Sequence, residues 1–465
     1  MTKRDAKASG VPLPSESEVN TSPRRQLWMN RNIDDRSRTL LDQDSRHFLH
    51  QSVSTPCLSV VTGAEGIWIE DIQGRRYMDF HGNNVHHIGY GHPRLNAAVK
   101  DQIDSLPFAP RRFTCEPAVA LARKLAAIAP GGLEKVLFTT GGSDAVEVAL
   151  KIARAATGRF KTLSFWDSFH GAGFGAASVG GEQLFRSGPA GPLLPGSEHV
   201  PPFGCYRNPF GYSHSSREPH APSCGSVCAD LVRYALQKEG DIAAVIAEPC
   251  RAVPDFAPPG FWVKIREACD EFGALLIFDE IPTGLGKTGR MFACQHEEVV
   301  PDILVLGKAL GGGLLPIAAT VCRAELDVGG NWAFGHYTHE KNPVTARAAL
   351  TTIEIIEQEG LVENAARMGN YATLRMQAMM DRFPAIGDVR GRGLLMGIEL
   401  VEDRRTRAPA EQLAENVLYA ALERGLNFKV AMGNVLTLTP PLTVTETDLE
   451  RAFDILEACL ETAAG

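Results

Sequence analysis

Three strongly apolar runs, separated by helical patterns, constrain the fold of this chain more than any other feature. The runs are "IAAVIAEP", "ALLIFDE" and "DILVLGKALGGG", and each stays apolar until polar residues or glycines end it. A strand that is apolar on both sides fits a parallel sheet with helices on both faces, because both surfaces of such a strand are buried. The sequence therefore predicts an α/β fold in which 91–340 form a large domain around a mostly parallel sheet.

The segments on either side of this region have different patterns. Residues 36–90 contain short alternating pieces around turn signals, and 341–465 contain a long helical stretch followed by strand-like pieces. Together they predict a smaller α+β domain, with 36–90 as its N-terminal segment and 341–465 as its C-terminal part. Residues 1–35 are polar and lack periodicity, which predicts a flexible arm, or an arm that orders only against a partner subunit.

Composition and charge limit the possible partners. The net charge of −8 over 465 residues argues against nucleic acid as the main partner. No apolar run reaches the roughly 18 residues that a membrane span needs, and the first 26 residues lack the apolar core of a secretory signal. Ten scattered cysteines are typical of a reducing compartment. We therefore expect a cytoplasmic protein that binds neither nucleic acid nor a membrane.

One group of cysteines allows a metal site as an alternative. Cys205, Cys224 and Cys228 lie in a segment that also holds His214 and His220, and thiolate and imidazole are zinc ligands. The spacings are loose, however, and the segment is rich in Pro and Ser. We therefore expect ordinary thiols in an inserted loop and no metal.

Three strand ends carry the residues that suggest chemistry. In open parallel sheets, ligands bind beyond the carboxyl ends of the strands. Gly142 and Ser143 lie at a strand-to-helix turn that suits a phosphate group, although such a turn can also be only a turn. Asp279 ends an apolar strand, where a carboxylate needs a cation or caps the next turn. Lys308 lies between an apolar strand and glycines, where low dielectric lowers the pKa of an amine and makes it nucleophilic.

These three features meet the requirements of one cofactor, pyridoxal 5'-phosphate. It needs an anion site for its phosphate, a carboxylate for its ring nitrogen and a lysine for a Schiff base. The motifs "TTGGSDAVEVALKIAR", "DEIPTGLGKTG" and "LGKALGGG" resemble, in this order, those of the class III (ω-type) aminotransferases. The resemblance covers about 45–460 and implies the pyridoxal-phosphate fold type I, with a seven-stranded-type sheet.

The resemblance also implies roles for individual residues. Lys308 would form the Schiff base and move the substrate proton, and Asp279 would pair with the ring nitrogen. Gly142 and Ser143 would hold the phosphate, and Phe169 would stack on the ring.

Three further residues complete the cofactor site that the resemblance implies. His170 follows Phe169 in the "SFHG" motif, and Glu248 keeps a family glutamate. Thr338, four residues before Asn342, would reach the phosphate bound by a neighbouring subunit. This implies a homodimer with shared active sites.

The sequence departs from the family pattern at several positions. Val253 replaces a glutamate that in many members pairs with an arginine, which matches Arg390 here. Without that glutamate we expect Arg390 to be unpaired and free to hold an anionic substrate group. Arg251 and Pro282 replace two family glutamines. These changes favour a one-substrate lyase, although they are also compatible with neutral variation in an ordinary transaminase.

The segment "DFHGNNVHHIGYGHP" is closest to the phospholyase branch of the family, and the chain as a whole most resembles the lyase branch that degrades phosphonates. That likeness implies an amino-phosphonate substrate, which would lose a hydroxyl group and release ammonia. Arg111, Arg112, Arg251 and Arg390 are candidate phosphonate ligands, since a guanidinium group suits a dianion. Each could equally pair with a surface carboxylate.

The acid for the leaving hydroxyl group is open at this level, and His170, Tyr337 and His339 are candidates. The alternatives to a lyase of this kind are an ω-aminotransferase that uses pyruvate or 2-oxoglutarate and a phospholyase that expels phosphate. A non-catalytic cofactor-binding protein is a third, which the presence of both Lys308 and Asp279 disfavours.

Overall fold

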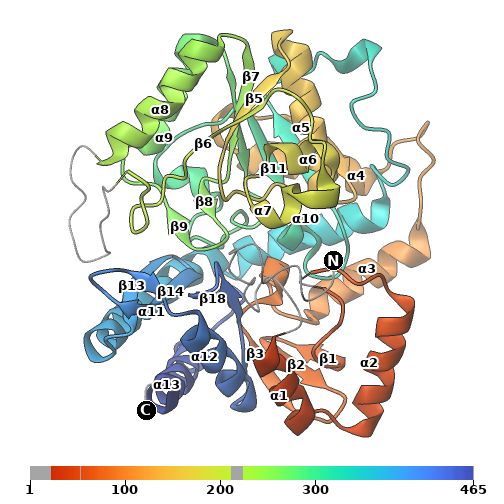
Figure 1. Ribbon diagram of the computed structural model, residues 1–465. Helices are drawn as coiled ribbons and strands as arrows, with labels where there is room; N and C mark the ends of the chain where they lie inside the picture. Colours follow the sequence, from red (N-terminus) through yellow and green to blue (C-terminus); the bar gives the residue numbers. More distant parts are fainter. Residues whose placement is uncertain (1–21, 53, 211–223, 464–465) are drawn as a thin grey trace.

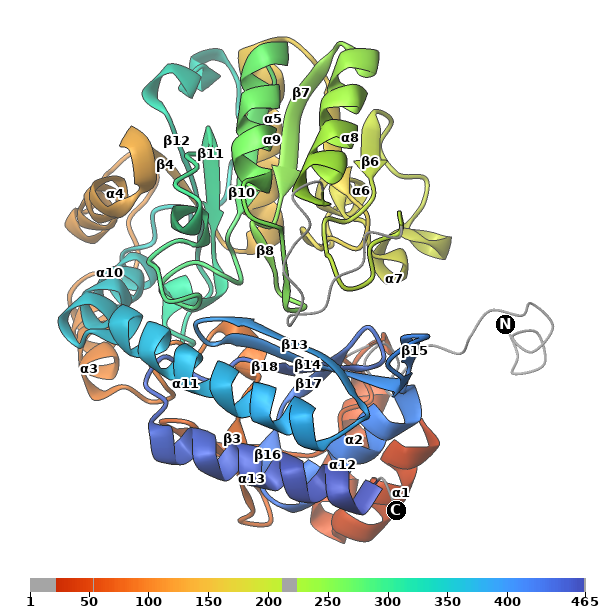
Figure 2. The ribbon, with the colours of Figure 1, turned by 90° about the vertical axis from the view of Figure 1, so that its left-hand side faces the viewer.

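The structure is a computed structural model in which residues 22–52, 54–210 and 224–463 are described (Figure 1). Figure 2 shows an upper layer with a large sheet between helices, and a lower layer with a smaller sheet and long helices. The predicted α/β fold with a smaller mixed domain is therefore confirmed. The exact domain boundaries stay a prediction.

The upper layer is built on a seven-stranded sheet, in the order β4-β12-β11-β10-β7-β5-β6. Neighbouring strands pair in parallel from β11 to β6, and only β12 runs antiparallel to its neighbours β11 and β4. In sheet order the strands are β4 (Lys135–Thr139), β12 (Ala318–Cys322), β11 (Ile303–Leu306), β10 (Leu275–Asp279), β7 (Ile242–Ala247), β5 (Lys161–Phe165) and β6 (Ser197–Val200).

Alternate residues of these strands enter two different cores, which explains why the runs are continuously apolar. In β7, Val245 packs into the core that includes Trp262, while Ile246 packs into the core that includes Val146. Both faces of the sheet are therefore covered by helices. The helices of this layer are α4 (Glu116–Ile128), α5 (Gly142–Thr157), α6 (Phe174–Val179), α7 (Gln183–Arg186), α8 (Cys224–Glu239) and α9 (Phe261–Phe272). Helix α3 (Pro93–Ser105) lies lower and packs against α10 (Pro343–Gln358) (Figure 2).

The lower layer combines the C-terminal part of the chain with the segment around 61–79. Strand β16 pairs in parallel with β3, so a four-stranded sheet in the order β1-β2-β3-β16 joins the two segments. Its strands are β1 (Val61–Glu65), β2 (Trp68–Asp71), β3 (Arg76–Asp79) and β16 (Leu426–Asn427).

The second sheet of this layer is antiparallel and follows the order β13-β14-β18-β17, with β15 beside β14. Helix α11 packs along β13, and α13 runs beside α11 (Figure 2). The elements are α10 (Pro343–Gln358), α11 (Leu361–Arg382), β13 (Ile386–Arg392), β14 (Leu395–Asp403), β15 (Ala408–Pro409), α12 (Glu411–Glu423), β17 (Lys429–Ala431), β18 (Val435–Leu438) and α13 (Glu446–Ala463).

The expected flexible arm is wrong for its last third. Helix α1 (Pro23–Asn32) starts after the capping side chain of Ser22, and a second helix, α2, spans Asp35–His47. Trp28 is only 3% exposed and packs against Tyr419 of α12. A single tryptophan gives no helical periodicity, and its partner lies far along the chain, so the local pattern did not reveal this contact. Residues 1–21 lie outside the described ones.

Two further findings concern absences within the described residues. No helix there is both long and apolar enough to cross a membrane.

Among the described residues, no group of three or more His, Cys, Asp or Glu side chains could hold a metal ion. Cys205 and Cys228 are buried, and Asn208 donates a hydrogen bond to the Cys228 sulfur at 3.3 Å. The side chain of Cys224, together with His214 and His220, lies outside the described residues, so the zinc alternative stays untested.

Candidate active site

A cavity of about 610 Å³ opens where the carboxyl ends of β10 and β11 face the lower layer. Its walls come from both layers, including the loop after β5 and strand β17. Many of the residues predicted from sequence line this one cavity: Gly142, Ser143, Phe169, His170, Glu248, Arg251, Asp279 and Lys308.

Lys308 and Asp279 reach the same place because their strands are parallel neighbours. Asp279 is paired with Val305 in the register of β10 and β11, and Lys308 follows two residues after β11 ends. Burial lowers the pKa of the Lys308 amine, and the negative charge of Asp279 opposes that shift. The backbone of Lys308 has a φ of 44°, a left-handed conformation that is uncommon for a residue with a side chain and marks many functional sites.

Asp279 is held rigidly at the base of the cavity. Asp279 is 1% exposed, and one of its carboxylate oxygens accepts a hydrogen bond from His170 Nδ1 at 2.8 Å. The other oxygen accepts the backbone N–H of Ile281 at 3.0 Å. These bonds orient the carboxylate and hold it as an acceptor for a protonated ring nitrogen. The second ring nitrogen of His170 is buried and has no hydrogen-bond partner among the described residues.

The backbone at the start of α5 forms a close-fitting cradle. Gly141 caps the helix without a side-chain hydrogen bond, and the next two residues, Gly142 and Ser143, line the cavity. A Cβ atom on Gly142 would lie 2.7 Å from the end of the Ile281 side chain. Gly171 has a φ of 126°, and a Cβ there would lie 2.9 Å from Cα of Ser143. Ser143 Oγ accepts the N–H of Ala172 at 3.0 Å, which ties the two loops together.

Glu248, which directly follows β7, connects the end of that strand to the loop that carries Phe169. Its two carboxylate oxygens accept the backbone N–H groups of Phe169 and Ala252, each at 3.0 Å. The Phe169 ring lies against Phe185, with ring centroids 4.6 Å apart. Glu248 therefore positions the phenyl ring at the cavity wall.

Arg390 corrects one prediction made from the sequence. It was expected to be unpaired because Val253 replaces a glutamate, but Glu399 on the adjacent strand β14 accepts from it at 2.8 Å and Asp388 at 3.1 Å. Arg390 Nε also donates to the carbonyl oxygen of Pro254. Two carboxylates from the small domain thus compensate for the missing glutamate, and Arg390 does not line the cavity.

Several other predicted residues lie away from this cavity in the single chain. Arg111 pairs with Glu340 at 3.6 Å and donates to the carbonyl oxygen of Tyr337, and Arg112 is exposed. Thr338 and His339 are also exposed. None of these residues lines the cavity, so their roles toward substrate or cofactor stay predictions.

Sequence reasoning missed five charged or titratable residues of the cavity wall: Arg25, His81, Glu182, Tyr419 and Lys429. His81 belongs to the quoted segment "DFHGNNVHH", and burial lowers the pKa of its imidazole to about 4. That motif could have identified His81. Arg25 in α1 and Lys429 in β17 have no local signal, because they join the cavity only through the packing of distant segments.

The comparisons with known proteins agree with this geometry. The family description "Aminotransferase class-III" matches residues 50–460. The chain belongs to the class-III aminotransferase family. It is therefore an enzyme of that family, and the family assignment predicted from the three motifs is confirmed.

Among the curated members of the family, an (R)-1-hydroxy-2-aminoethylphosphonate ammonia-lyase of Vibrio splendidus strain 12B01 is 46% identical over 454 residues. The match covers 96% of this chain and 95% of that protein. A leucine/methionine racemase of Thermococcus litoralis is 36% identical and covers 91% of this chain and 96% of that protein. The two relatives are therefore named for different reactions, one as a lyase and one as a racemase.

A solved structure of the family matches the fold. The ω-transaminase from Pseudomonas jessenii, in complex with PMP, superposes with a TM-score of 0.85 at 30% identity. The match covers 91% of this chain and 98% of that chain.

Proposed function

We propose that this enzyme is a pyridoxal-phosphate-dependent lyase that converts (R)-1-hydroxy-2-aminoethylphosphonate into phosphonoacetaldehyde and ammonia. The observation that carries the proposal is the position of Arg251, which is buried in the wall of the cavity that also contains Lys308 and Asp279. A guanidinium group at this place suits a substrate with a doubly charged phosphonate. The 46% identity to a lyase with this substrate supports the same conclusion.

The residues present fit the cofactor. Asp279 is a buried, hydrogen-bonded carboxylate, which suits a protonated pyridine nitrogen. The backbone around Gly142 and Gly171 has no room for a Cβ atom and lies at the N-terminus of a 16-residue helix, which suits a phosphate group. Phe169 offers an aromatic face beside them. Pyridoxal phosphate bound here would supply an electron sink for the carbon that bears the substrate nitrogen.

The chain's own residues then account for the proton movements. The lowered pKa of Lys308 makes its amine available as a neutral base, which removes a proton from the substrate carbon that bears nitrogen. Arg251 holds the phosphonate and so fixes which carbon faces Lys308. Loss of the hydroxyl group from the neighbouring carbon gives an enamine product, which water hydrolyses to the aldehyde and ammonia.

One incubation tests this function against its alternatives. The purified enzyme with pyridoxal phosphate and the hydroxy-aminophosphonate, without any keto acid, is expected to release equal amounts of aldehyde and ammonia and no phosphate. Turnover that begins only after pyruvate or 2-oxoglutarate is added would identify an ω-aminotransferase. Release of phosphate would identify a phospholyase. The Lys308→Ala variant serves as the control and should lose turnover by several orders of magnitude.

We also propose that two copies of the chain share their active sites. Support comes from Thr338, which is exposed and outside the cavity of its own chain although it matches the family's phosphate-binding threonine. Light scattering should give the mass of a dimer. Thr338→Val should weaken binding of the cofactor, measured by its visible absorbance after dialysis, without changing the mass. Unchanged retention would contradict the role of Thr338.

A further inference from the structure

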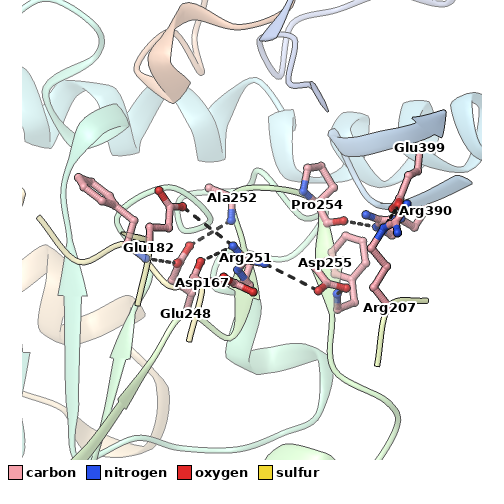
Figure 3. Close-up of polar contacts among 12 residues, drawn as sticks. Asp167, Glu182, Arg207, Glu248, Arg251, Ala252, Pro254, Asp255, Arg390 and Glu399 are labelled. Atoms are coloured by element: carbon pink, nitrogen blue, oxygen red, sulfur yellow. Dashed lines mark hydrogen bonds and ion pairs between the residues drawn. The ribbon is translucent and has the colours of Figure 1, made fainter. Parts of the chain in front are cut away.

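Glu182 is a second carboxyl group on the substrate side of the cavity, and the predicted mechanism has no role for it. It precedes the short helix α7 and lines the cavity together with Arg251. A Glu182 oxygen lies 4.0 Å from the Arg251 guanidinium, and its side chain is 26% exposed. Figure 3 shows Glu182, Asp167 and Asp255 around Arg251, while Glu399 and Arg207 surround Arg390 on the other side of Pro254.

The three carboxyl groups of the cavity differ in their hydrogen bonds. Glu248 accepts two backbone N–H groups, and Asp279 accepts one backbone N–H group and one imidazole N–H group. The carboxylate oxygens of Glu182 accept no hydrogen bond from any described residue. Burial raises the pKa of Glu182, and the charge of Glu248 adds to that effect, while Arg251 and Lys429 oppose it. Glu182 is therefore a cavity carboxyl group with unused hydrogen-bonding capacity and a raised pKa, as an acid requires.

The position of the hydroxyl group in the proposed substrate requires an acid beside the phosphonate site. In the proposed substrate the hydroxyl group is on the carbon that carries phosphorus, so the group that protonates it must lie beside the phosphonate site. Arg251 is the buried cation of that site, and Glu182 is its neighbour. A phosphonate dianion bound to Arg251 would neutralise the cation that now favours ionised Glu182, and would raise the pKa of the carboxyl group further.

We propose that Glu182 is the acid that protonates the leaving hydroxyl group of the aminophosphonate, an inference that depends on the proposed lyase function. Lys308 removes the proton from the carbon that bears nitrogen, and the electron pair of that C–H bond forms the carbon–carbon double bond. The C–O bond breaks with its electron pair on oxygen. The Glu182 proton moves to that oxygen, so the leaving group departs as water and Glu182 becomes a carboxylate.

The other candidates fit this task less well. Tyr337 and His339 do not line the cavity. In a neutral imidazole of His170 the single N–H is the one that Nδ1 donates to Asp279, so Nε2 has no proton to give. His81 lines the cavity, but its pKa of about 4 leaves the imidazole neutral near pH 7, without a proton that it can readily give.

The test separates removal of the first proton from loss of the hydroxyl group. Glu182→Gln keeps the size of the side chain but has no acidic proton. In D₂O, this variant is expected to exchange the hydrogen on the nitrogen-bearing carbon of the hydroxy-aminophosphonate at a rate within about fivefold of wild-type turnover, measured by NMR. Its formation of phosphonoacetaldehyde should fall about 10²- to 10⁴-fold, which is the usual contribution of a general acid.

A substrate analogue provides the decisive second measurement. With fluorine in place of the hydroxyl group, the leaving group is a weak base and needs no proton. Elimination of fluoride by Glu182→Gln should therefore lie within about tenfold of the wild-type rate, while elimination of water stays slow. Glu267→Gln, on the exposed side of α9, is the matched control and should leave all three rates unchanged.

Two results would overturn the inference. One is water elimination by Glu182→Gln at the wild-type rate. The other is an equal loss of exchange, fluoride elimination and water elimination, which would show that Glu182 only supports the structure of the site. If the wild-type enzyme itself forms no aldehyde without a keto acid, the proposed function fails instead, so the two failures are distinguishable.

Discussion

The two arginines near the substrate side of the active site have opposite environments (Figure 3). Arg390 contacts two carboxylates at 2.8 and 3.1 Å and donates to a carbonyl oxygen as well. Arg251 has two carboxylates only at 4.0 Å, donates to the carbonyl oxygen of Asp167, and has a buried Nε without a partner among the described residues. The side chain of Arg251 is also the more buried one, at 6% exposed against 15%.

This difference is the one we expect between a structural cation, Arg390, and the proposed substrate-binding cation, Arg251. The charge of Arg390 is already satisfied by β13 and β14, so a substrate would have to displace close carboxylates to reach it. Arg251 keeps unused hydrogen-bonding capacity in the cavity that Lys308 also lines, and a bound dianion would accept these hydrogen bonds. Under the proposed function, a single anionic substrate would be recognised by a fixed cation, so the site would need no arginine that switches partners.

The largest expected effect is on stability, at Arg390. Arg390→Met removes the cation that contacts both Asp388 and Glu399 and leaves Arg207 as the remaining arginine on Glu399, which should lower the free energy of unfolding by about 3–5 kcal/mol in urea denaturation. The KM for the aminophosphonate in the folded enzyme should change less than about threefold. Arg367→Met on α11 is the control, because the exposed Arg367 side chain donates to the neutral side chain of Asn364. A normal stability with a large rise in KM would reverse the assignment of the two arginines.

The next effect is on substrate binding, at Arg251. Arg251→Met removes charge-assisted hydrogen bonds to the phosphonate, which are worth about 1.5–3 kcal/mol, so KM should rise about 10- to 150-fold. The free energy of unfolding should change less than in Arg390→Met, since the Arg251 ion pairs are long. Steady-state kinetics on both variants under identical conditions make the comparison. If KM is unchanged, Arg251 is not the phosphonate ligand.

A smaller effect is expected from Val253→Glu, which places a carboxylate on the cavity wall near Arg251. The new negative charge should compete with the dianion, and KM should rise about tenfold at low ionic strength. Val253→Gln has nearly the same size without the charge and should retain most of the affinity. Equal losses in both variants would show that the effect is steric.

The smallest effect is expected at Lys429, an exposed residue on the opposite wall of the cavity. Lys429→Met should raise KM about threefold, and the difference from wild type should shrink as salt is added, because exposed charges are screened. The measurement is KM at low and at high ionic strength. A salt-independent change larger than that of Arg251→Met would make Lys429 the principal phosphonate ligand.

Sequence reasoning succeeded where neighbouring residues carry the signal. The apolar runs of β7, β10 and β11 predicted buried parallel strands, and the strand ends predicted where Asp279 and Lys308 meet. It failed at α1, where one buried tryptophan gives no periodic pattern, and at Arg390, where the absence of one glutamate suggested an unpaired cation. Glu399 takes that role from an adjacent strand, and only the register of β13 and β14 brings it there.

Short stretches of neighbouring residues determined the class of fold, the candidate cofactor site and the family. Each of these depends on residues that lie next to one another at strand ends. The tertiary structure decided which charged side chains line the same cavity. Glu182 and Arg251 are far apart in the chain, and so are Lys429 and Arg25, yet they line one cavity. The physical reason is that pairing of buried charges depends on distances across packed elements, which no local pattern of residues records.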